Sequence, residues 1–198
     1  MNHITFWGGV SQCGAYVLWV RAQIDSEIAF GRFRGGRPVP VAAGHYAYVG
    51  SAMGQRGASA LAGRLLRHAT RTGNKPPHAI RAAMADAFAA YQLGPVGLGP
   101  PAGKRLHWHV DYLLDESRIE IEAVTVIRTV EHVEGRLARG LAAVPGVVPL
   151  LPGLGASDAP GETHLLRLPD DEMDWHDRIK AILTEGSEVS WGRLRLGS

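Results

Sequence analysis

Tyrosine, arginine and histidine recur at short, regular spacing in the first third of the chain. The stretch GHYAYVGSAMGQRGASALAGRLLRH, residues 44–68, places Tyr46 and Tyr48 two apart and Arg64 and His68 four apart. Residues two apart on a strand share a face, and residues four apart on a helix lie together. Arginine can hold a phosphate, and tyrosine or histidine can exchange a proton with water. The pattern favours chemistry on a phosphate, against the alternative of core tyrosines and a solvated basic helix face.

A later helical pattern, EHVEGRLARGL, carries two glutamates, Glu131 and Glu134. A single helical glutamate beside an apolar stripe is usually an ordinary surface residue. Beside tyrosines and an arginine, however, it could be an oxygen ligand for Mg²⁺, which takes few protein carboxylates and keeps its waters.

The stretch HWHVDY spaces His107, His109 and Asp111 two apart, so that on a strand they would share one face. Two histidines and an aspartate can bind Zn²⁺ or Mn²⁺, but along a straight strand they spread over ~13 Å. Two other interpretations stay open: a hydrogen-bonded layer that lines a cleft with the tyrosines, or a buried His–Asp pair that fixes the sheet. We expect His164 and His176 to be ordinary polar positions.

Strands and helices must position these residues, and their patterns predict an α+β domain with a small, mainly antiparallel sheet flanked by helices. The expected strands are Gly14–Ala22, 26–33 as its hairpin partner, 45–50, 105–114 paired with 119–129, and a short strand at 164–168. The expected helices are 57–70, 78–91, 130–144 and 170–185, and Gly/Pro-rich or irregular loops are expected at 93–104 and 145–163.

The 198 residues, 45% hydrophobic and 20% charged, suit a single domain over 1–198 with a helix and loop inserted at 73–103. Cys13 is the single cysteine of the sequence, which excludes an internal disulfide and either favours a reducing compartment or is neutral in this respect. The sequence shows no signal-peptide pattern and no apolar run near the ~20 residues that span a membrane. We therefore expect a cytoplasmic protein without a membrane partner.

Charge is uneven along the chain although the net charge is only +2. Residues 1–110 carry 12 Lys or Arg against 3 Asp or Glu, and residues 111–198 carry 9 against 16. The plain interpretation is that surface helices differ in sign. The functional interpretation is a basic face for a polyanion together with an acidic region that could hold a metal.

The order GAY (with Tyr16), YVG, RLLRH and EGRLARGL resembles the GIY-YIG nuclease superfamily. In that superfamily a first strand carries Gly-x-Tyr, the next Tyr-x-Gly, a helix Arg-Leu-x-x-His, and a later helix a metal-binding Glu. GAYVLWVRA, GHYAYVGSA, RLLRH, HWHVDYLL and SDAPGETHL look more closely like a branch whose members stand alone or are fused to endonuclease III in some archaea. The resemblance covers roughly residues 10–72 and 104–168.

The resemblance implies a role for each matching residue. Tyr16 would be a general base or water-orienting group, and Tyr48 the second polar group at the attacking water. Gly50 would allow the tight turn, and Arg64 would stabilise charge on the scissile phosphate. The remaining matches are His68, one helical turn after the arginine, and Glu134 as the single metal ligand.

Three departures separate this chain from the superfamily pattern. About 28 residues, against roughly ten, separate GAY from YAYVG, and an extra strand at 26–33 would explain them. Residues 73–103 form the expected insertion, which could cover or widen a cleft. Cysteines of the branch are replaced by Gly135, Ala159 and Gly161, while Asp158 and His164 remain. A metal or redox site that used those cysteines would be lost here.

The sequence thus predicts hydrolysis of DNA phosphodiester bonds with Mg²⁺ (or Mn²⁺), carried out by Tyr16, Tyr48, Arg64, His68 and Glu134. Tyr46, Gly50, His107, His109 and Asp111 would line the cleft. Arg56, Arg67 and Arg71 would bind nucleic acid. One alternative is a non-catalytic nucleic-acid-binding module with a degenerate cleft. Another is a metal-handling or small-molecule protein built on the HWHVDY cluster.

Overall fold

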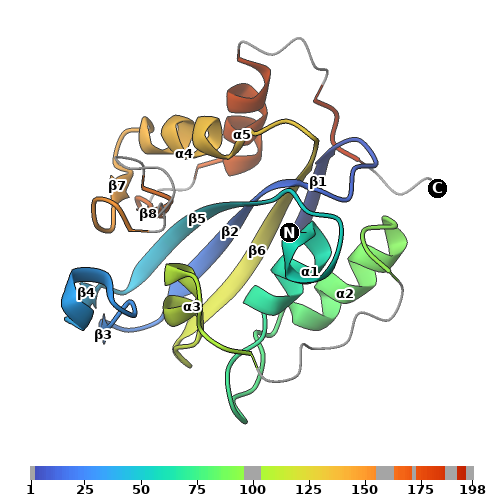
Figure 1. Cartoon of the computed structure of the whole chain (residues 1–198). Coiled ribbons are helices and arrows are strands. Elements are labelled where there is room, and N and C mark those ends of the chain that lie inside the picture. The colour runs from blue at the N-terminus through green and yellow to red at the C-terminus, as the bar shows by residue number, and fades with distance from the viewer. Residues whose placement is uncertain (1–2, 96–103, 155–162, 171–172, 186–190, 195–198) are drawn as a thin grey trace.

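The computed structural model of the chain describes residues 3–95, 104–154, 163–170, 173–185 and 191–194. A six-stranded mixed sheet forms its centre, and helices cover both faces (Figure 1). All neighbouring strands are antiparallel except the first pair, which is parallel. The expected α+β fold with a small, mainly antiparallel sheet is confirmed. The strand order is β1 (Ile4–Gly8), β6 (Ile119–Arg128), β2 (Gly14–Ala22), β5 (Gly44–Ala52), β8 (Leu165–Arg167) and β7 (Val148–Pro149).

The register of β2 and β5 brings the tyrosines together. Tyr16 lies opposite Gly50, and Leu18 lies opposite Tyr48. A Cβ atom on Gly50 would stand 2.5 Å from Cζ of Tyr16, so a side chain there would displace the buried tyrosine ring. Glycine at this position therefore serves the close approach of the Tyr16 ring across the strand pair.

Alternation along the strands builds two cores, because successive side chains point to opposite faces. Tyr16 and Leu18 face the core beneath α1 (Leu61–His68), α2 (Arg81–Ala90) and α3 (His109–Leu114). Ala15 and Val17 face the core beneath α4 (Glu134–Ala142) and α5 (Trp175–Thr184). The sheet thus separates a face rich in aromatic and polar residues from an aliphatic one.

The segment 105–114 is not the predicted strand, because its second half forms the short helix α3. The carboxylate of Asp111 accepts hydrogen bonds from the backbone N–H groups of His107 and Trp108, which stabilises the first turn of a helix. The strand β1, which was not predicted, pairs with β6 in place of 105–114. Alternation of polar and apolar residues therefore misled the prediction where a side chain capped the backbone.

The segment 26–33 is also not the hairpin partner of β2. Residues Ser26–Ile28 form β3, which pairs with β4 (Val39–Val41) in a separate two-stranded sheet. A 3-10 turn, η1 (Phe33–Gly36), lies between the two strands. The Phe33 ring contacts that of His109, with ring centroids 5.3 Å apart, so the turn η1 packs against α3.

The remaining helices lie where they were expected, with shorter bounds. The first is divided into a 3-10 turn, η2 (Gly57–Ser59), and α1. In the segment expected to be an insertion, Met84 and Phe88 of α2 are buried in the core beside Phe6 of β1. Much of the predicted loop 93–104 lies outside the described residues. No helix within the described ranges is long and apolar enough to span a membrane.

Candidate active site

Tyr16 and His68 form the centre of the candidate site. The Tyr16 hydroxyl lies 2.9 Å from Nε2 of His68, and both side chains are fully buried. The Tyr48 ring stands beside them, with centroids 6.2 Å from Tyr16 and 6.1 Å from His68. Tyr46 donates its hydroxyl to the Ala42 carbonyl (2.7 Å), outside this cluster. Strand register and the last turn of α1 thus bring together Tyr16, Tyr48 and His68, as the sequence led us to expect.

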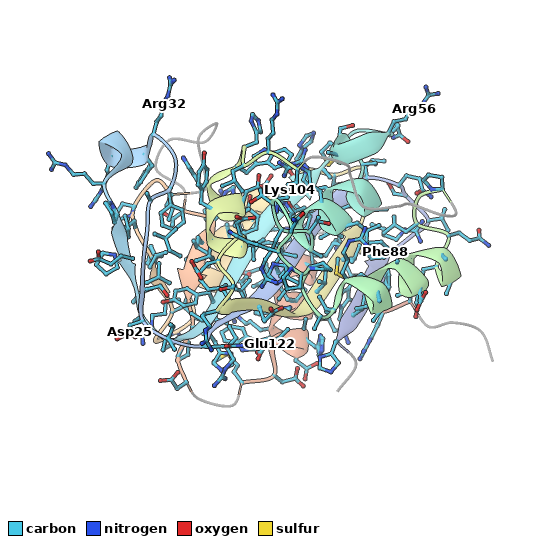
Figure 2. The ribbon with its side chains drawn as sticks, turned by 90° about the horizontal axis from the view of Figure 1, so that it is seen from below. Asp25, Arg32, Arg56, Phe88, Lys104 and Glu122 are labelled. Carbon is cyan, nitrogen blue, oxygen red and sulfur yellow. The ribbon has the colours of Figure 1, made fainter. Side chains whose placement is uncertain are left out.

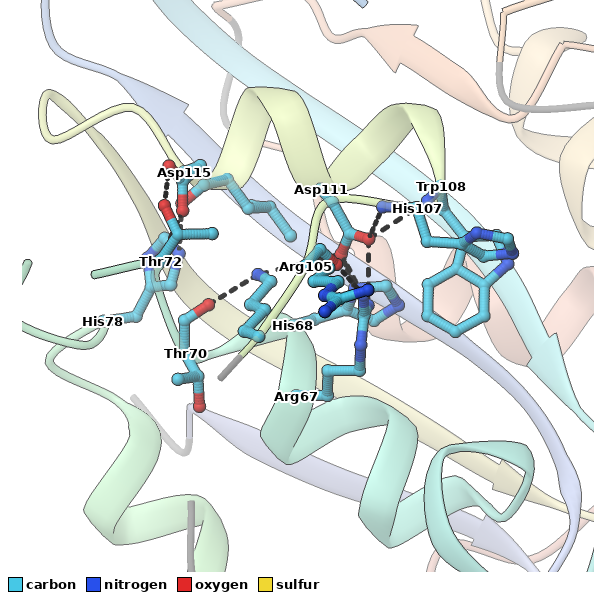
Figure 3. Close-up of polar contacts among 12 residues, drawn as sticks. Arg67, His68, Thr70, Thr72, His78, Arg105, His107, Trp108, Asp111 and Asp115 are labelled. Carbon is cyan, nitrogen blue, oxygen red and sulfur yellow. Dashed lines mark hydrogen bonds and ion pairs between the residues drawn. The ribbon is translucent and has the colours of Figure 1, made fainter. Parts of the chain in front are cut away.

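Asp111 contacts the second ring nitrogen of His68, and Figure 3 shows the polar contacts around it. Its Oδ1 is 3.3 Å from Nδ1 of His68, and Nη1 of Arg67 is 2.9 Å from both carboxylate oxygens. The Lys104 ammonium is 3.7 Å from Oδ1. Asp111 therefore reaches the site, but from a helix rather than from the strand predicted for it.

Arg64 is held in one direction by its neighbours. Its Nη1 donates to the Ser51 carbonyl (3.0 Å) and its Nε to the Ala58 carbonyl (2.6 Å). Its guanidinium also stands 4.1 Å from the Trp108 ring, and the Arg67 guanidinium is 4.4 Å from the same ring. Such cation–π contacts restrict long side chains that would otherwise sample many rotamers.

Glu134 approaches from the opposite face of the sheet. It is the first residue of α4, and one carboxylate oxygen accepts a short hydrogen bond from the Ser51 hydroxyl. Nδ1 of His164 lies 3.1 Å from the other oxygen. Ser51 thus joins the two halves of the site, because its carbonyl accepts from Arg64 while its hydroxyl donates to Glu134.

The edge of β5 explains how Glu134 comes close. The strand β8 pairs with β5 from Tyr46 to Tyr48, and the Val49 N–H then donates to the His164 carbonyl at 2.9 Å. This contact places His164 at the end of the paired stretch, where Glu134 can meet it. Sequence reasoning treated His164 as an ordinary polar position and overlooked Ser51. The sequence held a signal for each residue. His164 directly precedes a short predicted strand, and Ser51 directly follows Gly50.

Burial shifts the titration of this cluster. Burial, together with nearby Tyr48, raises the pKa of Tyr16 well above its ordinary value, although Arg64 opposes the shift. Burial lowers the pKa of His68 despite the attraction of Asp111. Burial alone would raise the pKa of Asp111, but the hydrogen bond to His68 and the charge of Lys104 hold it well below its usual range. The resting state is therefore a neutral phenol, a neutral imidazole and a carboxylate.

Glu134 suits a divalent cation that keeps most of its waters. Its side chain is 27% exposed, so water can reach the carboxylate. Among the residues that the structure describes, no group of three or more His, Cys, Asp or Glu side chains could hold a metal together. One carboxylate with surrounding water fits Mg²⁺ or Mn²⁺ better than a zinc site built from three or four protein ligands.

The side chains of His107, His109 and Asp111 do not converge. The His107 ring contacts Trp108, with centroids 5.0 Å apart, and the His109 ring contacts Phe33. Asp111 is directed to His68. The shared strand face predicted for these residues is wrong, because His107 precedes α3 and, within the helix, His109 and Asp111 are separated by a rotation of about 200°.

The three arginines proposed to bind nucleic acid have different surroundings. Arg56 is exposed, whereas Arg67 is engaged by Asp111. Arg71 is buried, and its Nη2 donates to the Ile119 carbonyl and to Glu120. The predicted nucleic-acid contact therefore does not fit the position of Arg71. Of the positions where the branch has cysteines, Gly135 lies in α4, whereas Ala159, Gly161 and the neighbouring Asp158 lie outside the described residues.

Comparison with known proteins identifies one family. The model of the family described as "Domain of unknown function DUF123" matches residues 15–186, which is most of the chain, so the protein belongs to that family. No curated protein and no solved structure matches the chain.

Proposed function

We propose that this DUF123 protein hydrolyses phosphodiester bonds in DNA with Mg²⁺ or Mn²⁺. The observation that carries the proposal is the cluster of Tyr16, Tyr48 and His68 beside a fixed Arg64, with one partly exposed carboxylate, Glu134, across the strand edge. Phosphodiester hydrolysis needs an oriented water, a route for its proton and neutralisation of charge on the phosphate. These groups can supply all three.

Arg64 would contact the phosphate. A guanidinium has five N–H donors in a planar fork, and the two backbone carbonyls engage two of them. The Trp108 ring supports the group from its flat side. A guanidinium fixed in this way can stabilise charge that develops on phosphate oxygens without first losing conformational freedom.

Glu134 would hold the metal ion. When bound, a divalent cation neutralises charge on the phosphate and lowers the pKa of a coordinated water. The Ser51 hydroxyl donates to one oxygen of the carboxylate, and Nδ1 of His164 lies 3.1 Å from the other. Second contacts of this kind orient metal-binding groups.

Exposed arginines support a polyanionic substrate. Arg32, Arg34 and Arg37 are exposed around η1, which packs against α3 through Phe33. Figure 2 shows Arg32 and Arg56 projecting from the same side of the molecule. Arginines that contact backbone phosphates provide affinity without base specificity.

Cys13, the single cysteine, is a buried free thiol, and we place this activity in the cytoplasm.

The test compares wild type, Glu134→Gln and Glu131→Gln on labelled single-stranded, duplex, flap and four-way-junction DNA, each with Mg²⁺, Mn²⁺ or EDTA. Glu131 is an exposed carboxylate three residues before Glu134, and so it is the matched control. We expect metal-dependent cleavage that Glu134→Gln loses and Glu131→Gln keeps. If wild type cleaves no substrate but binds DNA in a salt-sensitive way, the protein is the non-catalytic binding module instead.

A further inference from the structure

We propose that Asp111 is a positioning residue: it holds His68 in the tautomer whose Nε2 accepts the proton of Tyr16. Its place in a reaction rests on the hydrolysis proposed above, whereas the tautomer itself does not. The inference starts from a buried chain of three side chains, Tyr16, His68 and Asp111, in which each member contacts the next.

The contacts of Asp111 fix its charge. Its Oδ2 accepts from the backbone N–H groups of His107 (2.9 Å) and Trp108 (3.0 Å). Nη1 of Arg67 lies 2.9 Å from each oxygen, and the buried Lys104 ammonium lies 3.7 Å from Oδ1. A protonated carboxyl would point a hydroxyl hydrogen at one of these donors. Asp111 is therefore an ionised carboxylate and can only accept hydrogen bonds.

An acceptor at Asp111 determines the protons of His68. The Nδ1 atom, 3.3 Å from Oδ1, must carry the hydrogen of this pair. Neutral imidazole has one N–H group, so Nε2 has a lone pair and accepts from the Tyr16 hydroxyl at 2.9 Å. The Tyr16 oxygen can then only accept further hydrogen bonds, and the Arg64 side chain is one neighbouring donor.

This arrangement gives the Tyr16 proton a destination. As water attacks phosphorus, Tyr16 gives its hydroxyl proton to Nε2 of His68, and the Tyr16 oxygen takes a proton from the water. A P–O bond forms to the hydroxide, the P–O bond to the leaving oxygen breaks, and that oxygen is protonated by solvent. The imidazolium, stabilised by Asp111, then returns its proton to solvent through Tyr16. Asp111 stays ionised throughout.

Other charged groups also face His68, and they do not replace Asp111. Arg64 and Lys104 disfavour an imidazolium, and the Tyr48 ring packs against the imidazole edge. Asp111 is the group whose charge opposes them, at hydrogen-bond distance from the ring. An imidazolium at His68 would cost much free energy if it were buried without a partner of opposite charge, and Asp111 is that partner.

Asp111→Asn tests the assignment with little change in volume. Oδ2 has three donors within hydrogen-bond distance, the backbone N–H groups of His107 and Trp108 and Nη1 of Arg67. Among the described residues, Oδ1 has only Nη1 of Arg67 besides His68. The amide oxygen should therefore take the place of Oδ2, and the amide NH₂ should face Nδ1 of His68. The imidazole hydrogen then moves to Nε2, which points it at Tyr16. An Asp-to-Asn change in the serine-protease triad acts in this way, with the geometry kept and the tautomer reversed.

The experiment measures long-range ¹H–¹⁵N correlations of the imidazole nitrogens in wild type, Asp111→Asn and Asp115→Asn, with the His68 signals identified by their absence in His68→Gln. Asp115 follows α3 directly, is also buried, and bonds Thr72 and Lys75 rather than His68. We expect a protonated Nδ1 in wild type and in Asp115→Asn, and a protonated Nε2 in Asp111→Asn.

A protonated Nε2 in wild type overturns the proposal, and this result needs no folded variant. An unchanged tautomer in a folded Asp111→Asn overturns it as well. If the nuclease assay succeeds, kcat should fall about 10³-fold or more in Asp111→Asn, with KM little changed. Loss of activity without a tautomer change would assign Asp111 a merely structural role. Absence of cleavage by wild type, with the expected tautomers, would reject hydrolysis and leave the positioning intact.

Discussion

The two faces of the sheet solve the same packing problem with different residues. Beneath α4 and α5 the core consists mainly of aliphatic side chains, which include Leu137, Leu141 and Ile179. Beneath α1 and α3 the core includes a tyrosine, a histidine and an aspartate, Tyr16, His68 and Asp111, which are all fully buried. The first face needs only complementary volume, whereas the second must also satisfy every hydrogen bond.

The difference shows where the fold carries chemistry. Buried polar groups contribute little to stability when they are paired, and they cost free energy when a partner is removed. The polar face is therefore more sensitive to single changes than its buried volume suggests. Glu134 is the exception on the aliphatic side, because it stands at the first turn of α4 and reaches the edge of β5 through Ser51.

The largest effect is expected from changing one buried leucine on each face of the sheet. Leu65 of α1 and Leu141 of α4 are both fully buried, one on each face. Each change to alanine should lower the free energy of unfolding by about 2–5 kcal/mol, because it removes buried methyl groups and leaves a cavity. Urea denaturation measures the loss. We expect the His68 NMR signals to move in Leu65→Ala and to stay in place in Leu141→Ala; equal shifts would contradict the separation of the faces.

Acid should act on the polar face. Burial and the charge of Arg71 lower the pKa of His78 to about 4, against an ordinary value of 6.5. Between these two pKa values His78 binds a proton in the unfolded chain but not in the folded protein. The free energy of unfolding is therefore fully present above pH 6.5 and decreases as the pH falls toward 4. The loss should be about 2–3 kcal/mol across that window. Urea denaturation at several pH values should show a shallower dependence in His78→Gln, and identical slopes would argue against this assignment.

Two glycines allow a smaller, paired test. In Gly50→Ala the new methyl would meet the Tyr16 ring, and in Gly140→Ala it would meet Ile182 at 2.7 Å. Overpacking should lower stability by about 1–3 kcal/mol in Gly50→Ala. Gly140 lies inside α4, where alanine gains about 1 kcal/mol of helix propensity, so its net loss should be smaller. Thermal denaturation ranks the two, and the reverse order would refute the close approach at Tyr16.

Removal of two different tyrosine hydroxyls should have similar effects on stability but different effects on DNA cleavage. Tyr16→Phe removes the partner of His68, and Tyr46→Phe removes the partner of the Ala42 carbonyl. Each should lower the free energy of unfolding by about 1 kcal/mol. If the protein is a nuclease, cleavage should be lost in Tyr16→Phe and kept in Tyr46→Phe, measured in the same DNA assay. Equal activity of the two variants would exclude Tyr16 from the reaction.

Elements with continuous apolar patterns were predictable from the sequence. The strand Gly14–Ala22 was predicted with its observed bounds, and β6 was predicted to within one residue, because both faces of these strands are buried. The segment 105–114 was not predictable in this way. The capping contacts of Asp111, formed with two backbone N–H groups, select a helix there despite alternating polarity.

The candidate site was predictable only in part. The proximity of Tyr16 and His68 followed from the motif order, and the structure places them in contact. The roles of Ser51 and His164 were not predictable, because they depend on where β8 stops pairing with β5. The burial of Arg71 was also not predictable, since the partner that holds it, Glu120, lies 49 residues later in the chain.

The sequence by itself determined the fold class, the long strands β2 and β6, and the residue types of the candidate site, since local periodicity and composition carry that information. Tertiary structure decided the polar contacts that no motif indicated. The pairing of Tyr16 with Gly50 and the approach of Glu134 to Ser51 join residues 34 and 83 positions apart. Such contacts form because burial of apolar surface on both faces of the sheet sets the register of the strands. No local sequence pattern determines which residues are then opposite each other.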